Sequence, residues 1–403
     1  MVRYIVEKIL DNLYLLRVND RVKFFEALWD IPEGITYNAY LLISKDGVVL
    51  FDGWKDEYAE DLLDAIRTIS DPNDIKYIVV HHVEQDHSGS IQRVLEANSG
   101  IAEVLCHPLA VKMLQSLYTA SFKFKIVKDG EEFSLGDRTL KFIYTPWLHW
   151  PETIVSYIVE DGVLLSCDAF GGFSIPSTVF DDEEDITNYL KYVRKYIVNV
   201  IGYYSDYILK ALDKIRGIGV SPKIITPAHG IIFRKNPEII VDYYERVARG
   251  LSERGKITVI YNSMYGSVEK AIHHAIGELE KRGFKPVTFK FTDSERPAIG
   301  DILSEIIDSE ALVIGVSVYE NDLFPYVSYL LELMAKKIRV GKPILLISSY
   351  GWSKVASSKV SDKLARTYFK IVESIEFQGQ PDMEDLEKIS EGVIRLLEAI
   401  NQG

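Results

Sequence analysis

The sequence predicts an α/β protein of two domains, for three reasons. The chain has 403 residues, more than one domain usually holds, and 47% of them are apolar. From residue 256 onward, apolar strand-like runs alternate regularly with helical stretches, which is typical of a doubly wound parallel sheet. Before that point strands are more numerous, with helices interspersed among them. We therefore predict domains at residues 1–252 and 253–403.

The first domain is expected to begin with β structure. Apolar or alternating runs bounded by turn residues indicate strands at residues 4–6, 13–18, 40–43 and 48–51. Later strands are expected at residues 75–80, 103–107, 138–144, 153–167 (a hairpin) and 223–226. Apolar spacing and Pro108 indicate helices at residues 57–69, 91–96, after 108, across 185–216 and at 236–254.

The second domain is expected to begin with a buried strand at residues 257–261. A Ser/Gly loop follows, and then a helix over residues 269–281. Further strands are expected at residues 287–291, 312–316 and 344–347, separated by helical stretches, and the last helix at residues 383–400.

Charge and cysteine content argue against several functions. The net charge of −13 disfavours nucleic acid or an anionic membrane as a main partner. Cys106 and Cys167 show no pairing pattern, which favours a reducing, cytoplasmic location, and two thiols cannot supply a four-cysteine iron–sulfur cluster. We find no signal-peptide segment at the N-terminus and no uncharged run of transmembrane length.

A cluster of potential metal ligands follows the strand expected at residues 75–80. Residues 81–87 read His-His-Val-Glu-Gln-Asp-His and hold three of the eight histidines of the chain. Imidazoles and carboxylates at this spacing indicate a metal site, although they leave the metal and the reaction open. Three more apolar strands each end at one potential ligand: His149, Asp168 and His229. We expect these residues to share the site, because loops at strand ends can direct ligands to one point.

The combined pattern resembles two related families. The form H-x-x-x-D-H, followed by single His, Asp and His residues at strand ends, is similar to the metallo-β-lactamase fold. The form H-x-E-x-D-H, with Glu84 where zinc hydrolases usually carry His, resembles the flavodiiron proteins, also called A-type flavoproteins. This resemblance covers essentially the whole chain. It implies a metallo-β-lactamase-like αββα sandwich followed by a flavodoxin-like doubly wound parallel sheet.

The resemblance also implies two iron ions per chain. The ligands that it implies are His82, Glu84 and His149 for one iron, Asp86, His87 and His229 for the other, and Asp168 as the bridge. The family varies at the position of His87, which is therefore either a ligand or an open position. His81 lies outside the pattern and is expected to be a core or supporting imidazole. Replacing one imidazole by Glu84 moves the metal preference from zinc toward iron or manganese.

The loop after the strand at 257–261 has the composition of a phosphate-binding turn. Small hydroxyl residues and Gly266 allow backbone N–H groups and a helix N-terminus to surround a phosphate. The chain has neither G-x-G-x-x-G nor G-K-[ST] there, which argues against dinucleotide and P-loop sites. The segment is similar to the FMN phosphate loop of flavodiiron proteins, except that Val268 stands where the family usually has Thr.

Two later loops complete the expected FMN site. The loop at residues 315–325 departs from the family pattern for this loop, G-S-P-T-Y-N, at Val316, Ser317 and Val318. The loop at 348–353 matches the corresponding third loop of the family well. Trp352 after a parallel strand can stack on a planar ring. The FMN contacts implied by the resemblance are Ser263, Met264, Tyr265, Gly266, Ser267, Val268, Ser317, Tyr319, Ser349, Tyr350, Gly351 and Trp352.

The resemblance implies an oxidoreductase that reduces dioxygen to water, nitric oxide to nitrous oxide, or both. FMN would pass electrons to the iron pair. No cysteine-paired rubredoxin module precedes Gly403, so we expect an external donor, rubredoxin or a reduced deazaflavin coenzyme. The family's head-to-tail pairing implies a homodimer or a dimer of dimers. Two alternatives stay open: a zinc-dependent metallo-β-lactamase-like hydrolase with a flavodoxin-like module, and a flavin electron shuttle with a silent metal site.

Overall fold

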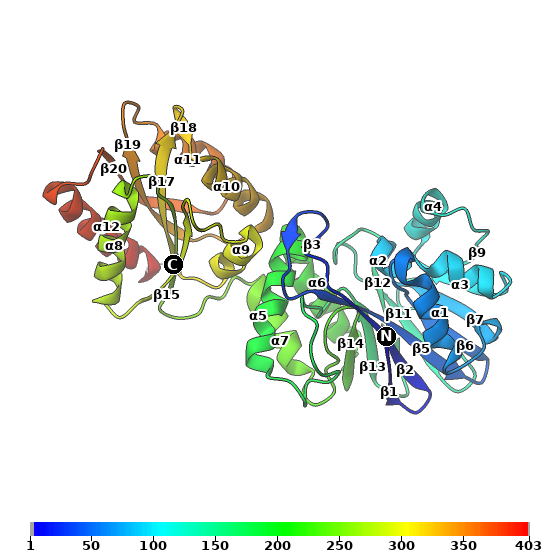
Figure 1. Cartoon of the computed structure of the whole chain (residues 1–403). Helices are drawn as coiled ribbons and strands as arrows, with labels where there is room; N and C mark the ends of the chain where they lie inside the picture. Colours follow the sequence, from blue (N-terminus) through cyan, green and yellow to red (C-terminus); the bar gives the residue numbers. More distant parts are fainter. Residues whose placement is uncertain (1–3, 402–403) are drawn as a thin grey trace. The chain divides into compact units, whose positions relative to one another are not determined.

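The computed structural model describes residues 4–401 and divides into two compact units, Met1–Glu245 and Arg246–Gly403. The first unit is coloured from blue to green in Figure 1, and the second from green to red. The division falls inside helix α7 (Glu238–Ala248), before the boundary that we expect between residues 252 and 253. That boundary stays a prediction.

Two β-sheets build the first unit. One has the order β1-β2-β5-β6-β7-β8-β9, with strands at Tyr4–Leu10, Leu13–Asp20, Ile35–Ser44, Gly47–Phe51, Ile75–Val80, Glu103–Cys106 and Lys123–Ile126. The other has the order β10-β11-β12-β13-β14, with strands at Glu132–Ser134, Thr139–Tyr144, Ile154–Ile158, Val163–Cys167 and Ile224–Pro227. A small hairpin pairs β3 (Phe24–Phe25) with β4 (Trp29–Asp30).

Helices cover the outer faces of these two sheets. Apolar residues of both sheets share one buried core, to which Phe51 and Val79 contribute from one sheet and Phe142 and Leu165 from the other. Figure 1 shows α1 and α3 beside the first sheet and α5, α6 and α7 beside the second. This layering confirms the predicted αββα sandwich. The helices are α1 (Ala59–Arg67), α2 (Gln85–Ser88), α3 (Ile91–Ala97), α4 (Pro108–Leu117), α5 (Ile186–Tyr196) and α6 (Ser205–Gly217).

Strand direction brings several strand ends to one edge of each sheet. Strands β6, β7 and β8 run parallel. In the other sheet β13 and β14 run parallel, and β11 and β13 are both antiparallel to β12, so that these three strands share one direction. The loops after β7, β11, β13 and β14 are those in which the sequence predicts metal ligands.

The second unit is a parallel sheet with helices on both faces. Its main path has the order β16-β15-β17-β19-β20, and every pair along this path is parallel. The strands are β15 (Lys256–Asn262), β16 (Lys285–Phe291), β17 (Ala311–Tyr319), β18 (Asp322–Leu323), β19 (Pro343–Tyr350) and β20 (Lys370–Gln378). This order is that of flavodoxin-like sheets, as predicted.

Helices α8 and α12 share a core with one face of this sheet, and Figure 1 shows α9, α10 and α11 on the other side. The helices of the second unit are α8 (Ser267–Glu280), α9 (Ile299–Ile307), α10 (Pro325–Lys337), α11 (Ala356–Leu364) and α12 (Met383–Asn401).

Several elements differ from the sequence-based expectation: the short strands β3, β4, β9, β10 and β18 were not predicted, and one helix and one longer strand differ as well. The helix expected at residues 236–254 ends at Ala248, because Gly250 adopts φ +67° and the next residue, Leu251, donates its N–H back to the Arg246 carbonyl, as in a Schellman cap. Strand β20 was not predicted, since Glu373, Ser374 and Glu376 interrupt its apolar pattern. It lies at the edge of the sheet, where polar residues are tolerated.

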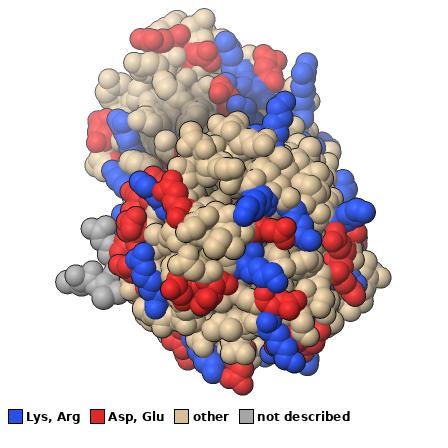
Figure 2. All heavy atoms as spheres, turned by 90° about the vertical axis from the view of Figure 1, so that its right-hand side faces the viewer, with Lys and Arg blue, Asp and Glu red and all other residues tan. Residues whose placement is uncertain are grey.

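On the face drawn in Figure 2, neither charge dominates. Lys and Arg side chains alternate there with Asp and Glu side chains, without a continuous basic area among the residues described (Figure 2). Among the helices described, none combines the length and the apolar composition needed to cross a membrane.

Candidate metal centre and flavin site

Donor side chains from four strand ends meet in the first unit. Along the chain they are His82, Glu84, Asp86 and His87 after β7, His149 after β11, Asp168 after β13 and His229 after β14. All are buried except Glu84, whose side chain is 19% exposed. The structure thus brings together every residue that the sequence predicts as an iron ligand.

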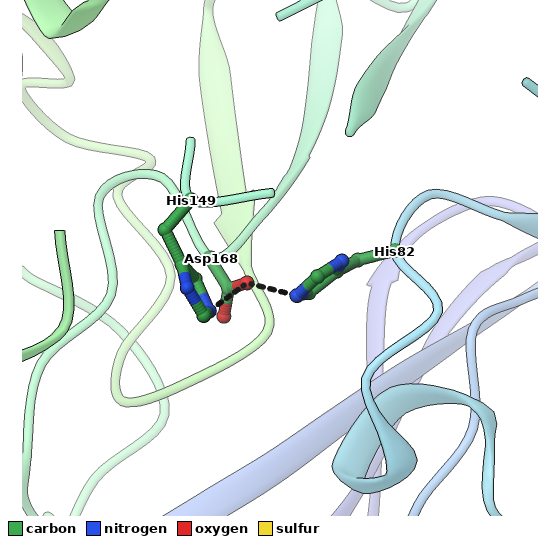
Figure 3. Close-up of side chains that lie close together, drawn as sticks. All are labelled: His82, His149 and Asp168. Atoms are coloured by element: carbon green, nitrogen blue, oxygen red, sulfur yellow. Dashed lines mark ion pairs between the residues drawn. The ribbon is translucent and has the colours of Figure 1, made fainter. Parts of the chain in front are cut away.

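The first donor group consists of His82, Glu84 and His149. The Nε2 atoms of His82 and His149 lie 3.3 and 2.9 Å from Glu84 Oε2. The same two nitrogens lie 3.6 and 3.7 Å from Asp168 Oδ2, as Figure 3 shows. Both imidazoles therefore point at the same oxygen of Asp168, one from the loop after β7 and the other from the loop after β11.

The second donor group consists of Asp86, His87 and His229. The Nε2 atoms of His87 and His229 lie 3.5 and 3.6 Å from the Asp86 carboxylate. Each also lies 3.1 Å from Asp168 Oδ1. His87 is thus close enough to belong to this group.

Asp168 stands between the two groups and turns one oxygen to each. Its Oδ2 and both carboxylate oxygens of Asp86 are buried and lack a hydrogen-bond donor among the residues described. Burying a carboxylate without a partner costs free energy, and a cation bound among these atoms would neutralise its charge. The donor set of imidazoles and carboxylates therefore fits two metal ions that share Asp168.

Neighbouring groups fix the orientation of the imidazoles. His82 Nδ1 donates to Glu152 Oε1 over 2.8 Å, and His229 Nδ1 donates to the Thr36 carbonyl over 2.7 Å. In both residues the donated N–H leaves Nε2 free to bind a metal. His81 uses both ring nitrogens, toward Asp52 at 2.6 Å and Ser156 at 2.8 Å, so it supports the fold beneath the site.

A large cavity opens onto these donors. Its volume is about 1010 Å³, and Glu84 and Asp86 form part of its wall. Phe24, Phe25 and Trp150 line it with apolar rings. A small diatomic molecule can reach the donor groups from this side.

A second cavity, of about 340 Å³, lies in the second unit where the three predicted flavin loops meet. Ten of the twelve predicted residues line it, all except Gly266 and Val268, and three that were not predicted also contribute: Val318, Glu320 and Gly379. Gly266 precedes α8 with φ +86°. Val268 packs its side chain into the core, so only its backbone can face a ligand. Tyr265 and Trp352 are 90% and 82% exposed, which leaves their rings available for stacking.

Comparison with known proteins agrees with both sites. Residues 35–230 match the model of the ODP family beta lactamases, and residues 259–392 match that of flavodoxin. A point variant of the flavo di-iron protein from Thermotoga maritima is 40% identical, with 99% of both chains covered and a TM-score of 0.93. The nitric oxide reductase of Moorella thermoacetica is 34% identical over 388 residues, which are 95% of this chain and 96% of that protein. This chain is a flavodiiron protein.

The rubredoxin-oxygen oxidoreductase of Megalodesulfovibrio gigas is a further relative, 30% identical over 400 residues, with 97% of this chain and 98% of that protein covered. A flavodiiron protein is an oxidoreductase that carries FMN and two iron ions, and both cavities fit these cofactors. The comparisons do not favour the zinc hydrolase, which was the main alternative from the sequence.

The shifted pKa values in the flavodiiron site show that its carboxylates need positive charge beside them. Burial alone would lower the pKa of His82, but Glu152, Glu84 and Asp168 together raise it to about 10. Burial would raise the pKa of Asp168, yet His87, His229 and His82 hold it well below its usual range. Without metal, protonated imidazoles thus compensate the carboxylates. Metal binding must displace those protons.

Some supporting residues of this flavodiiron protein could not be predicted from the sequence. Tyr196 donates to Asp168 Oδ1 over 2.7 Å from helix α5, and Thr36 holds His229 from β5. Tyr196 stands in no recognisable motif. Thr36 lies in the segment at residues 34–38, which belongs to the family resemblance, but nothing in that segment indicates a contact with His229. Glu152 carried a signal, because it follows His149 by three residues in the segment His-Trp-Pro-Glu, but its contact is to His82.

Proposed function

We propose that this flavodiiron protein reduces dioxygen to water, nitric oxide to nitrous oxide, or both. The observation that carries the proposal is Asp168, a buried carboxylate whose two oxygens face two separate donor groups. A flavin cavity on the same chain supports it. The names of two relatives, nitric oxide reductase and rubredoxin-oxygen oxidoreductase, indicate these two substrates.

We assign the ligands as predicted: His82, Glu84 and His149 for one iron, Asp86, His87 and His229 for the other, with Asp168 as the bridge. When bound, FMN and the iron pair supply the electrons and the diatomic-binding positions. Asp168 would hold both metals, because its two carboxylate oxygens face the two donor groups.

Rapid mixing tests the proposed activity. The anaerobically reduced protein is mixed with dioxygen or with nitric oxide, and the flavin absorbance is followed. We expect at least one gas to reoxidise the flavin within seconds. If neither does so, the proposed activity is wrong, and metal analysis that finds zinc without flavin would restore the hydrolase.

An external protein or coenzyme is proposed as the electron donor, either rubredoxin or a reduced deazaflavin coenzyme. The name of the Megalodesulfovibrio gigas relative supports rubredoxin. Reduction of the bound flavin by each donor, measured anaerobically, decides between them. Reduction by neither would contradict both assignments.

We further propose a homodimer or a dimer of dimers in the cytoplasm. The head-to-tail pairing that the resemblance to flavodiiron proteins implies supports this assembly, in which electrons would pass from the flavin of one copy to the iron pair of the other. Dilution to monomer should abolish turnover while both cofactors stay bound, and full activity of the monomer would refute the dimer. Cys106 and Cys167 are free and buried, in keeping with a reducing compartment.

A further inference from the structure

A buried arginine lies behind the turn that carries His229. Arg17 on β2 is only 1% exposed. Its guanidinium donates to the Gly230 carbonyl over 2.6 Å, to the Thr178 carbonyl over 3.0 Å and to Asn38 Oδ1 over 3.0 Å. These three acceptors are all uncharged. A buried cation without an anionic partner is costly, so a purely space-filling role would favour an apolar residue here.

The two carbonyls belong to segments that follow proposed iron ligands. Gly230 comes directly after His229, and Thr178 lies in the segment between Asp168 and helix α5. One planar guanidinium therefore ties both segments to strand β2. The rigid fork of an arginine suits this task better than the single ammonium of a lysine.

Strand β5 holds the same turn from a second direction. Asn38 Nδ2 donates to the Gly230 and Pro227 carbonyls over 3.0 and 2.9 Å. Thr36 Oγ1 accepts the Gly230 N–H over 2.7 Å, and the Thr36 carbonyl accepts His229 Nδ1–H. The orientation of the His229 ring thus depends on the position of this turn relative to β5. Arg17 sets that position because it binds both Asn38 and Gly230.

We propose that Arg17 is a positioning residue for the iron held by Asp86, His87 and His229. Its fork fixes the Gly230 carbonyl, and through it the His229 ring, so that Nε2 stays directed at Asp86 and Asp168. The other donor group has a separate support, Glu152 against His82. Loss of Arg17 therefore acts on one iron and leaves the other in place. This inference rests on the ligand assignment in the proposed function.

The test compares two variants of the full-length protein, Arg17→Met and Asn98→Leu. Asn98 is the matched control, because it is fully buried in the same unit and donates to the Pro72 and Ile75 carbonyls over 2.8 and 3.0 Å. These contacts lie at the start of β7, whereas His82 follows its end. Both variants lose hydrogen bonds to two carbonyls, but only one loses them near His229.

Each protein is loaded anaerobically with ⁵⁷Fe²⁺, and iron per chain, FMN per chain and Mössbauer spectra are recorded. The thermal stability of the metal-free proteins is measured alongside. For Arg17→Met we expect one iron to bind about 10–100-fold more weakly, one Mössbauer component to disappear, and FMN content to stay unchanged. Asn98→Leu should lower thermal stability but keep both irons.

Wild-type affinity for both irons in Arg17→Met would overturn the inference, as would equal iron loss in Asn98→Leu. If Arg17→Met does not fold, Arg17→Lys replaces it, since it keeps the charge but lacks the fork, and the same selective loss is expected. Absence of two irons from the wild-type protein would instead refute the proposed function, independently of the variants.

Discussion

Glu84 is the residue that most distinguishes this site from that of a zinc hydrolase. It is the most exposed of the proposed ligands, and it forms part of the cavity wall. Its carboxylate lies beside the imidazoles of His82 and His149, so it adds negative charge where a diatomic would approach. A carboxylate in place of an imidazole shifts the metal preference toward iron and stabilises the ferric state.

Exchanging Glu84 for histidine should therefore change metal selectivity. In Glu84→His, loaded from equal ferrous and zinc ions, we expect the bound zinc-to-iron ratio to rise about tenfold, measured by elemental analysis. Glu57→His serves as the control, because Glu57 lines the same cavity but stands outside both donor groups. An unchanged ratio in Glu84→His would show that the carboxylate does not select the metal.

Among the glycines that the structure describes, Gly230 has the least room for a side chain. Its φ of +83° disfavours any side chain, and a Cβ there would lie 1.8 Å from the Tyr189 hydroxyl. Gly230→Ala should cost about 1–3 kcal/mol from the backbone alone, with a further steric cost, in denaturant unfolding of the metal-free protein. Tyr189→Phe removes the clashing oxygen but also the acceptor of the Ile231 N–H, so Gly230→Ala should cost less when it is added to Tyr189→Phe than when it is added to the wild type. An equal cost in both backgrounds would place that cost in the backbone only.

At the scale of elements, the sequence predicted the site best where an apolar strand is followed by a single metal-binding side chain. Four apolar strands are each followed by a potential ligand, namely His82, His149, Asp168 or His229. The structure brings these four side chains together. Strand β20, the shorter strands β9 and β10, and the supports from Arg17, Thr36 and Tyr196 were missed. These residues act through contacts between distant segments, and nothing local separates a buried Arg17 from an exposed arginine in an alternating strand.

The loop after β19 places Trp352 in the flavin cavity, and this position predicts a role in FMN binding. Trp352 lines the flavin cavity with its ring largely exposed, so stacking on FMN should bury it. In Trp352→Ala we expect FMN to bind about tenfold more weakly, measured by fluorescence titration of the flavin-free protein. Tyr368→Ala is the control, since Tyr368 is 65% exposed in the same unit but does not line the cavity. Equal weakening in both variants would contradict a stacking role.

For the whole molecule, the described residues that form each cofactor site all belong to one compact unit. The metal centre takes residues from both sheets of the first unit, so it links the stability of that unit to iron. The flavin cavity depends on loops of the second unit. Loss of one cofactor should therefore leave the other site intact.

Metal removal should reverse the pH dependence of stability. In the metal-free protein the carboxylates around His82 raise its pKa to about 10, above its usual value of 6.5. The protonated ring therefore stabilises the fold fully below about pH 6.5, and this contribution is lost as pH rises toward 10. Glu84 and Asp168, whose pKa values are lowered, stay ionised throughout this window. Iron replaces the proton, so the loaded protein does not suffer this loss.

Thermal unfolding of both forms between pH 6.5 and 9 checks this expectation. The melting temperature of the metal-free protein should fall by about 5 °C or more, while that of the iron-loaded protein should hold or rise. Parallel curves for the two forms would mean that imidazole protons do not compensate the carboxylates.

The wide spread of the donors along the chain has a consequence for synthesis. Asp168 becomes available only when β13 has emerged from the ribosome, and His229 only after β14, so a nascent chain cannot hold the iron pair until nearly the whole first unit has been made. Iron capture must therefore follow translation of this unit. The phosphate turn and the two later flavin loops emerge afterwards. During synthesis the first unit therefore becomes able to bind iron before the second unit becomes able to bind FMN.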